Sequence, residues 1–240
     1  MPPAPLVPFP TRSVAHPQDL TVPELLLFRS PLQERPSAFA RATYPFLKRA
    51  IDLTLSLLLL LPIIPVLAVC ALAIRLDSPG PVFFTQPRTG KGGKRFRMYK
   101  LRTMYKNAEE LKEKYRHLNT QTWPDFKIPN DPRITRVGGF LRKTSLDELP
   151  QIVNVIIGDM SLVGPRPTSF AASTYDLWHT VRLEAKPGIT GLWQVSGRCN
   201  IDFDDRIRLD VAYIRNQSLW LDSKILAQTV LCVVSRKGAE

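Results

Sequence analysis

The sequence predicts an α+β protein, in which a membrane-inserted helical segment precedes a small cytosolic globular domain with short β-hairpins and amphipathic interface helices. Three observations lead to this fold class. Residues 53–74 form one uncharged apolar stretch, short strand-like runs and helical periodicity follow it, and positive charge is concentrated directly behind it. The length of 240 residues indicates one domain rather than several, and a hydrophobic content of 44% is enough for one ordinary hydrophobic core.

The overall composition excludes several classes of protein. A mean hydropathy near zero is too low for a protein with many membrane spans. The three cysteines are far apart in the sequence, which argues against a disulfide scaffold or a cysteine zinc site and favours a reducing compartment. The three histidines are scattered, and none lies at metal-ligand spacing.

The first segment, residues 1–43, contains nine prolines and no sustained periodicity. Prolines at this density prevent helix formation and remove ladder donors, so we expect a Pro-rich, mostly disordered tail to which we assign no role. We place the first domain boundary at its end, with a membrane segment at 44–76 and a globular domain with interface helices at 77–240.

The uncharged stretch 53–74 is the second segment. As a straight helix it would be about 33 Å long, which is enough to cross a hydrocarbon core of about 30 Å. Pro62 and Pro65 lie near its midpoint, where each removes a hydrogen-bond donor and predicts a break or kink. Basic residues flank both ends, and positive charge prefers the cytoplasmic side. The residues alone leave two alternatives open, a kinked single span and a re-entrant hairpin.

The remaining segments predict a globular domain. Residues 82–86 and 96–101 are typical of strands joined by the turn-rich stretch 87–93. We expect an exposed charged helix at 107–117, a helix that begins near Ser145 and ends at Gly158, and a turn with a short hairpin within 181–198. Two helices should follow at about 204–216 and 223–235, the last with an apolar face suited to a core or to a membrane surface.

Asp147 and Glu148 are the sharpest candidates for chemistry. Ser145 and Glu148 match the S-x-x-E capping box, so both acidic residues should lie in the first turn of a helix. The positive end of that helix would lower their pKa values and keep them ionised, and an ionised carboxylate can bind Mg²⁺ or attack a phosphoryl group. The alternative is that the two residues only cap the helix.

Four arginines near turns or near this acidic pair are candidates for phosphate binding. Arg142 precedes the pair, Arg166 lies between two prolines, Arg88 opens a basic glycine-rich turn, and Arg198 lies at a second turn. The arginine fork is suited to bidentate binding of phosphate. The alternative for each of them, which taken singly is the commoner case, is a solvated surface residue.

The net charge of +12 makes nucleic acid a rival partner. No helix-turn-helix, RNP or zinc-finger pattern is present, and a DNA-binding domain has no need of a 22-residue apolar segment. Residues 75–106 carry nine Lys or Arg against one Asp, directly after that segment. We therefore expect this basic segment to bind anionic lipid headgroups and to steer phosphorylated substrates, and we expect no nucleic acid partner.

Seven motifs in order resemble the bacterial sugar transferases, the monotopic phosphoglycosyl transferases that start exopolysaccharide and O-antigen assembly. The resemblance covers the chain from about residue 44 to residue 238. The motifs are KR-x-x-D (48–52), DSPGPVFF (77–84), KLRTM (100–104), DPRITR (131–136), SLDELPQ (145–151), GDMSLVGPRP (158–167) and KPGITGLWQVSGR (186–198).

The resemblance implies transfer of a sugar 1-phosphate from a UDP-sugar to undecaprenyl (polyprenol) phosphate, with release of UMP. By matching position, Asp147 would be the nucleophile that forms a covalent phosphosugar intermediate, and Glu148 would hold the Mg²⁺ cofactor. Arg142 would bind phosphate, and Arg166 and Arg198 would contact the nucleotide or its phosphates.

The resemblance also implies the re-entrant membrane helix, which would begin and end at the cytoplasmic face of the bacterial inner membrane. One departure concerns the break itself. Many members of the family have Ser-Pro there, whereas this chain has Leu61-Pro62 and a second proline, Pro65. The sequence does not reveal which sugar is transferred, and the apolar faces leave room for a homodimer. A basic membrane-surface scaffold is the alternative of a different class.

Overall fold

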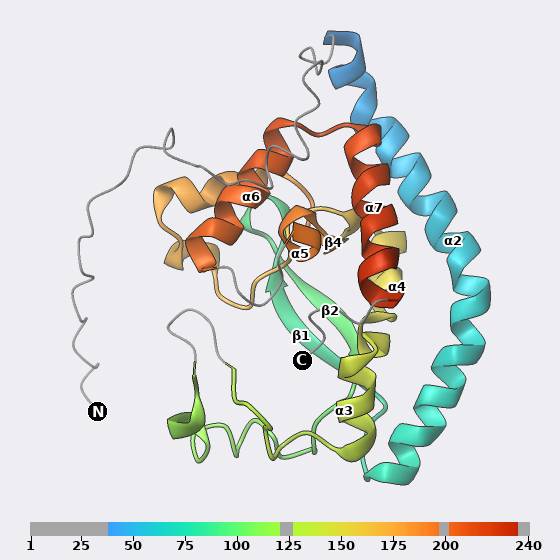
Figure 1. The fold of residues 1–240 in the computed structure, drawn as a ribbon, viewed down its shortest axis with the longest axis vertical. Coiled ribbons are helices and arrows are strands. Elements are labelled where there is room, and N and C mark those ends of the chain that lie inside the picture. The colour runs from blue at the N-terminus through green and yellow to red at the C-terminus, as the bar shows by residue number, and fades with distance from the viewer. Residues whose placement is uncertain (1–37, 121–126, 197–201, 235–240) are drawn as a thin grey trace. The chain divides into compact units, whose positions relative to one another are not determined.

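The computed structural model describes residues 38–120, 127–196 and 202–234. The predicted Pro-rich tail lies almost entirely outside these residues, and so does Arg198. The described chain mixes helices with two small sheets, and a long helix runs along one side of it (Figure 1). This arrangement confirms a mixed helix and strand fold with one long apolar helix.

Helix α2 (Ala38–Asp77) contains the whole apolar stretch. Among the described residues it is the one helix that is long and apolar enough to cross a membrane. It begins before the predicted boundary at residue 44 and continues through both Pro62 and Pro65, so the structure does not show two separate arms. Each proline removes only one hydrogen bond, and the neighbouring turns keep theirs, which permits a bowed helix rather than a chain reversal (Figure 1).

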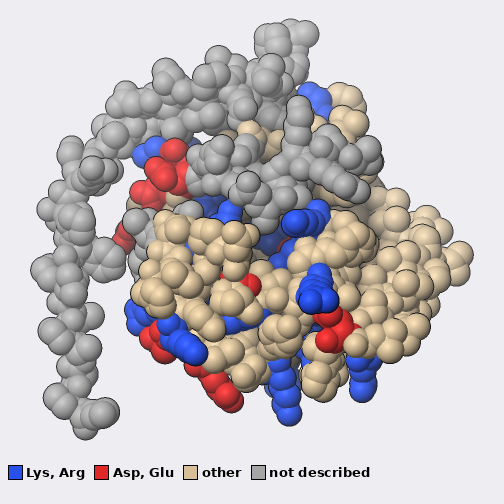
Figure 2. Space-filling model, turned by 60° about the horizontal axis from the view of Figure 1, so that its bottom comes forward, with Lys and Arg blue, Asp and Glu red and all other residues tan. Residues whose placement is uncertain are grey.

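The outer surface of α2 is apolar. Leu58, Leu61 and Val69 are 65%, 79% and 70% exposed. A continuous exposed apolar surface of this kind is unusual on a helix that faces water. Figure 2 shows this side of the molecule as a broad surface without Lys, Arg, Asp or Glu, at the right where α2 also lies in Figure 1. A lipid environment would remove this surface from water.

The C-terminal half of α2 is fixed to the globular domain by a small hydrophobic cluster. Cys70 and Ile74 of α2 pack with Leu101 and Leu141, and all four are buried. Burying a side chain of this size contributes about 1.5–3 kcal/mol. The buried Arg102 completes the attachment, since its Nη2 donates to the carbonyl oxygen of Ser78 at 2.6 Å and its Nη1 to that of Pro79 at 2.6 Å, directly after the helix end.

The N-terminal half of α2 is fixed to the same domain by polar contacts. Arg49 donates to the carbonyl oxygens of Val155 and Ile156 at 2.6 and 2.9 Å, at the end of α4 (Gln151–Ile157). Asp52 accepts a hydrogen bond from the Ser161 hydroxyl at 2.7 Å, at the start of β3 (Ser161–Val163). Both flanks of the apolar stretch are therefore bound to one globular domain.

The first predicted hairpin is confirmed. Strands β1 (Phe83–Thr89) and β2 (Arg95–Leu101) are antiparallel, and Phe83 pairs with Leu101. The connection includes the 3-10 turn η1 (Lys91–Gly93), where Gly92 and Gly93 have φ of 65° and 76°. Glycine adopts such left-handed conformations without a steric penalty, which accounts for the glycine-rich turn in the sequence.

The second predicted hairpin is wrong. Strand β4 (Gly188–Thr190) pairs in parallel with β3, and Ser161 faces Gly188 in the register. A Cβ atom on Gly188 would lie 2.1 Å from the main-chain nitrogen of Gly164, so these two glycines allow an approach that side chains would block. The predicted turn residues thus serve a close contact between distant segments rather than a local reversal.

The helices after β2 follow the predictions in part. Residues 106–115 form turns that end in the 3-10 helix η2 (Arg116–Leu118), so the charged helix predicted at 107–117 is wrong. Helix α3 (Arg136–Lys143) precedes the acidic pair and α4 ends at Gly158 as predicted. The described chain closes with η4 (Ala172–Thr174), η5 (Leu177–Glu184), α5 (Leu192–Ser196), α6 (Phe203–Arg215) and α7 (Leu219–Val234). The last two confirm the predicted helix pair.

Candidate active site

Asp147 and Glu148 lie in a short 3-10 turn, η3 (Leu146–Glu148), between α3 and α4. The predicted capping box is wrong. Ser145 adopts a left-handed conformation with φ of 57°, and its side chain makes no capping hydrogen bond. The α-helix begins only at Gln151, because Pro150 lies before it at the N-cap. The acidic pair is therefore held by the loop that joins two helices, not by the first turn of one.

The Asp147 carboxylate is buried and nearly unpartnered. Asp147 is 8% exposed, and among the described residues no hydrogen bond reaches its carboxylate. Its ion pair with the Lys100 ammonium is loose, at 3.7 Å. Burial raises the pKa of Asp147 above its usual range, Lys100 offsets part of that rise, and the negative charge of Glu148 adds to it. This result reverses the expectation of a pKa lowered by a helix terminus.

Glu148 has the opposite surroundings. Its Oε1 accepts from Lys100 Nζ at 2.8 Å and from Arg166 Nη2 at 2.5 Å, and its Oε2 accepts from Arg166 Nη1 at 3.2 Å. Burial alone would raise the pKa of Glu148, but Arg166 and Lys100 outweigh burial and hold it well below the usual range. The two adjacent carboxylates thus differ: Asp147 has a raised pKa and few contacts, whereas Glu148 has a lowered pKa and is held ionised by two cations.

Two further cations surround the acidic pair. Arg142 Nε donates to the Thr103 hydroxyl at 2.9 Å, and burial lowers the pKa of Arg142 although Asp147 raises it in part. Arg88 Nη2 donates to Gln86 at 2.6 Å. Burial and the neighbouring Arg166 lower the pKa of Arg88 to about 10, against the opposing effect of Glu148. Both guanidinium groups remain charged at neutral pH.

The site as a whole is cationic. Four positive side chains act on two carboxylates, an excess of two positive charges; they are Arg88, Lys100, Arg142 and Arg166 around Asp147 and Glu148. A partly buried excess of this sign attracts and neutralises a dianion such as a diphosphate diester. The free carboxylate among these cations has the surroundings that a phosphoryl-group nucleophile needs.

The structure brings together most of the residues singled out from the sequence. Arg88, Arg142 and Arg166 all act on the acidic pair, whereas Arg198 lies outside the described residues. Sequence reasoning missed the role of Lys100. The only signal was its place in the motif KLRTM, because its ion pair depends on where β2 ends relative to η3.

The basic segment 75–106 also has a more divided role than expected. Lys100 and Arg88 belong to the site, and Arg102 is buried against the end of α2. Arg95 donates to the carbonyl oxygens of Ser169 and Phe170. Only part of the charge in this segment is therefore left to contact lipid headgroups.

The acidic pair fits Mg²⁺ only as part of a shared site. Among the described residues, no group of three or more His, Cys, Asp or Glu side chains could hold a metal ion. A carboxylate has about four acceptor positions, and Glu148 uses three of them, which leaves one on Oε2. Mg²⁺ is usually bound by one or two carboxylates together with substrate phosphates, which this donor set permits.

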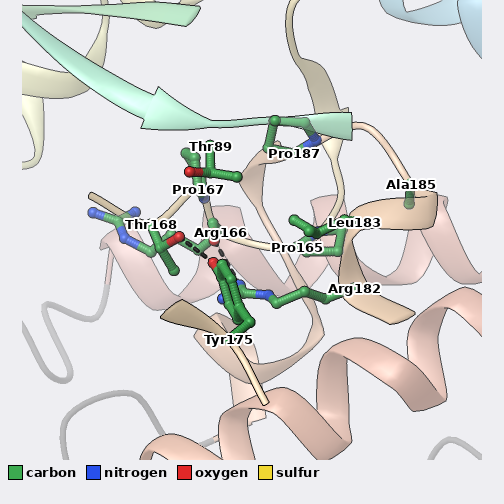
Figure 3. Close-up of a pocket in the computed structure, with 11 residues that line it drawn as sticks. Thr89, Pro165, Arg166, Pro167, Thr168, Tyr175, Arg182, Leu183, Ala185 and Pro187 are labelled. Atoms are coloured by element: carbon green, nitrogen blue, oxygen red, sulfur yellow. Dashed lines mark hydrogen bonds between the residues drawn. The ribbon is translucent and has the colours of Figure 1, made fainter. Parts of the chain in front are cut away.

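A small pocket adjoins the site on the side of Arg166. It is lined by the end of β1, the loop 165–168 and residues of η5, with Thr89, Pro167 and Arg182 among them (Figure 3). The Thr168 and Tyr175 hydroxyls are hydrogen-bonded to each other at its rim. Arg166 thus belongs both to the lining of this pocket and to the ion pair with Glu148.

Comparison with known proteins identifies the family. The profile of the family described as "Bacterial sugar transferase" matches residues 43–236. The chain belongs to this family. The match includes α2 from residue 43 onwards, both sheets and every residue of the cationic site.

Two of the three relatives of this bacterial sugar transferase described here have names that specify transfer to a lipid carrier. It is 45% identical over 205 residues to the undecaprenyl-phosphate galactose phosphotransferase of Salmonella typhimurium, which covers 83% of this chain and 43% of that protein. It is 44% identical over 206 residues to the UDP-glucose:undecaprenyl-phosphate glucose-1-phosphate transferase of Escherichia coli, covering 80% and 41%. The exopolysaccharide production protein ExoY of Rhizobium meliloti is 36% identical over 197 residues, covering 80% and 87%. The chain thus spans less than half of the first two relatives and most of the third.

Proposed function

We propose that this chain transfers a sugar 1-phosphate from a UDP-sugar to undecaprenyl (polyprenol) phosphate and releases UMP, as the first membrane step of exopolysaccharide or O-antigen synthesis. The observation that carries the proposal is the buried Asp147 carboxylate, which has no hydrogen bond among the described residues and lies within a group of four cations. The names of the relatives support the donor and the acceptor.

The first half-reaction joins the sugar phosphate to the protein. A carboxylate oxygen of Asp147 attacks the phosphorus that bears the sugar, a new O–P bond forms, and the bond between that phosphorus and the UMP oxygen breaks. UMP leaves with the electron pair of the broken bond. Lys100 and Arg166 form ion pairs with Glu148, and Arg142 interacts electrostatically with Asp147. A phosphoryl group attacked by Asp147 would therefore be close to these three cations, which neutralise the charge that builds up on its oxygens.

The second half-reaction regenerates the carboxylate. A phosphate oxygen of the polyprenol phosphate attacks the same phosphorus, and the bond to Asp147 breaks. The products are the free Asp147 carboxylate and a polyprenol diphosphosugar. Water could attack the intermediate in place of the acceptor, so the site must be closed to bulk water while the intermediate exists. The burial of Asp147 meets this requirement in part.

Glu148 is the residue that we propose as the protein ligand of Mg²⁺, through the acceptor position that its ion pairs leave free. A bound Mg²⁺ would supply charge neutralisation on the diphosphate of the donor. Arg166 and Lys100 keep Glu148 ionised in its absence, so the carboxylate is ready to bind when the nucleotide arrives.

A UDP-sugar screen tests the proposal. The purified protein is incubated with Mg²⁺, undecaprenyl phosphate and one UDP-sugar at a time, among them glucose, galactose and N-acetylated donors, and UMP is measured. We expect release of UMP with at least one donor and dependence of steady turnover on the lipid acceptor. If no donor gives UMP, the chain is a basic membrane-surface scaffold rather than an enzyme. GDP-sugars at the same concentration are the matched control for the nucleotide.

For the membrane segment, we propose that α2 is re-entrant and that the globular domain lies at the cytoplasmic face of the bacterial inner membrane. A helix that crossed the bilayer would place its ends on opposite sides, about 30 Å apart. Here Arg49 and Asp52 at one flank and Ile74 at the other all contact the same domain. Entry and exit by one face would satisfy these contacts and leave the exposed apolar surface of α2 for lipid, and it would require α2 to bend further at Pro62 and Pro65 than the continuous helix of this structure does.

Cysteine labelling tests this topology. In a variant with serine at the three natural cysteines, Ala42→Cys and Gly92→Cys are labelled in turn with a membrane-impermeant maleimide in inside-out and right-side-out vesicles. We expect both positions to react in inside-out vesicles only. Reaction of the two positions on opposite sides would contradict a re-entrant helix.

A further inference from the structure

The loop that carries Arg166 is held by one face of α6. Asp210 and Tyr213 lie three residues apart on this helix, which places them on the same side of it, and each is 1% exposed. The Tyr213 hydroxyl lies 3.1 Å from the carbonyl oxygen of Val163, at the start of the loop. The Asp210 carboxylate is directed to the other end of the loop, through an arginine.

That arginine is Arg182 of η5. Its Nη2 donates to Asp210 Oδ2 at 2.7 Å and to the main-chain carbonyl oxygen of Arg166 at 2.7 Å. Figure 3 shows the Arg182 side chain reaching this carbonyl from below the loop, with Pro165 and Pro167 on either side of Arg166. The two prolines restrict the backbone, so a fixed carbonyl at Arg166 also fixes the direction in which its side chain leaves the chain.

The pair is unusual as a device for stability alone. Both groups are almost completely buried, Asp210 at 1% and Arg182 at 6% exposure. Buried ion pairs are often no more stabilising than apolar residues of similar volume, because both charges must leave water. Burial raises the pKa of Asp210 to about 6, against the lowering effects of Arg182 and Arg206. The pair therefore costs free energy of solvation, and its contact with the loop that carries Arg166 would explain why the protein has the pair despite that cost.

We propose that Asp210 and Arg182 are positioning residues, which hold the Arg166 main chain so that its guanidinium group meets both oxygens of Glu148. The contacts form one chain: Asp210 orients Arg182, Arg182 binds the carbonyl of Arg166, and Arg166 makes a two-point ion pair with Glu148. A two-point pair depends on angle as well as distance, so it is sensitive to a small rotation of the loop. This inference rests on the proposed function only for its activity readout.

A double-mutant cycle separates positioning from general stabilisation. Asp210→Asn keeps the shape of the side chain and removes its charge, and it is made in the native background and in an Arg166→Ala background. The matched control is Asp205→Asn on the same helix, since Asp205 is half exposed and, among the residues that the structure describes, pairs with the partly exposed Arg208. For each variant, binding of diphosphate with Mg²⁺ is measured by calorimetry, and kcat and KM for UMP release are measured in parallel.

We expect Asp210→Asn to weaken diphosphate binding and to lower kcat/KM about 10- to 100-fold in the native background, as loss of supporting contacts does around other sites. In the Arg166→Ala background the same change should have less than about a twofold effect, because the residue through which Asp210 acts is gone. Asp205→Asn should change neither quantity in either background.

Several outcomes would overturn the proposal. Equal losses in both backgrounds would show that Asp210 acts on the whole fold rather than through Arg166, and no loss in the native background would show that it does not act on the site. Arg182→Lys, which keeps the charge but lacks the fork, should reproduce the Asp210→Asn pattern. If both variants fail to fold, the pair is a requirement of folding and the proposal is wrong. If the native protein releases no UMP, the proposed function fails, while the diphosphate cycle still decides the positioning role.

Discussion

Two neighbouring glycines of α3 have opposite surroundings, and alanine at each position should have opposite effects. A Cβ atom on Gly138 would lie 2.0 Å from the Thr103 carbonyl oxygen and 2.6 Å from its carbonyl carbon. A Cβ atom on Gly139 would meet its nearest neighbour, an Ile134 methyl group, at 4.0 Å. The first contact is with main chain that cannot rotate away, whereas the second is ordinary van der Waals contact.

The magnitudes follow from this difference. Gly139→Ala should raise the free energy of unfolding by roughly 0.5–1 kcal/mol, since alanine loses less conformational entropy in a helix than glycine. Gly138→Ala requires α3 and the Thr103 main chain, two residues after the end of β2, to separate by about 1–1.5 Å to restore normal contact distances. Overpacking of this kind costs about 1–3 kcal/mol. In a protein of this size each kcal/mol shifts the unfolding midpoint by about 2–4 °C.

Separation of α3 from the Thr103 main chain should also affect catalysis. Arg142 on α3 donates to Thr103, the residue that Gly138→Ala would displace. A misplacement of about 1 Å can lower a rate roughly 100-fold. The assay is UMP release together with the thermal unfolding midpoint, measured for both variants at one scan rate. Gly139→Ala should be more stable and fully active, and Gly138→Ala less stable and slow. Equal effects at the two positions would refute the reasoning.

Three further predictions concern the cationic site. The pKa of Asp147 is raised by burial, so kcat/KM should fall as the pH decreases with an apparent pKa above the usual range of aspartate; an acid limb at or below that range would contradict the buried nucleophile. Lys100→Met should lower kcat/KM about 100-fold and move this acid limb to higher pH, because Lys100 lowers the pKa of Asp147, whereas the surface control Lys112→Met should leave the limb in place. A limb that Lys100→Met does not shift would argue against an interaction between Lys100 and Asp147. Removal of divalent cations with EDTA should abolish UMP release and added Mg²⁺ should restore it, whereas activity that survives EDTA would exclude Glu148 as a ligand of an essential Mg²⁺.

The sequence predicted elements whose determinants are local. The hairpin β1–β2 follows from strand-like runs on either side of a glycine-rich turn, and α4 ends at Gly158 because the residue there has φ of 97°, which glycine tolerates. The pair α6 and α7 follows from helical periodicity. Asp147 and Glu148 were found because adjacent acidic residues before an apolar run form a recognisable pattern.

The remaining features depend on contacts between distant segments. Ser145 matches a capping box, but its left-handed conformation and Pro150 delay the helix to Gln151, and no local pattern reveals that. The opposite pKa shifts of Asp147 and Glu148 depend on where Lys100 lies, almost 50 residues away in the sequence. Parallel pairing of β4 with β3 was missed for the same reason, since glycines at 164 and 188 look like turn residues in isolation.

The covalent intermediate on Asp147 is the central claim, and an experiment without acceptor tests it most directly. The protein is mixed with Mg²⁺ and its UDP-sugar in the absence of polyprenol phosphate, UMP is counted, and peptides are then searched by mass spectrometry for a phosphosugar adduct. The account predicts a burst of at most one UMP per protein molecule, an adduct on the peptide that contains Asp147, and neither signal in Asp147→Asn, while Asp159→Asn at an exposed position behaves as the native protein. Absence of a burst from protein that turns over once acceptor is added, or an unchanged burst in Asp147→Asn, would contradict it.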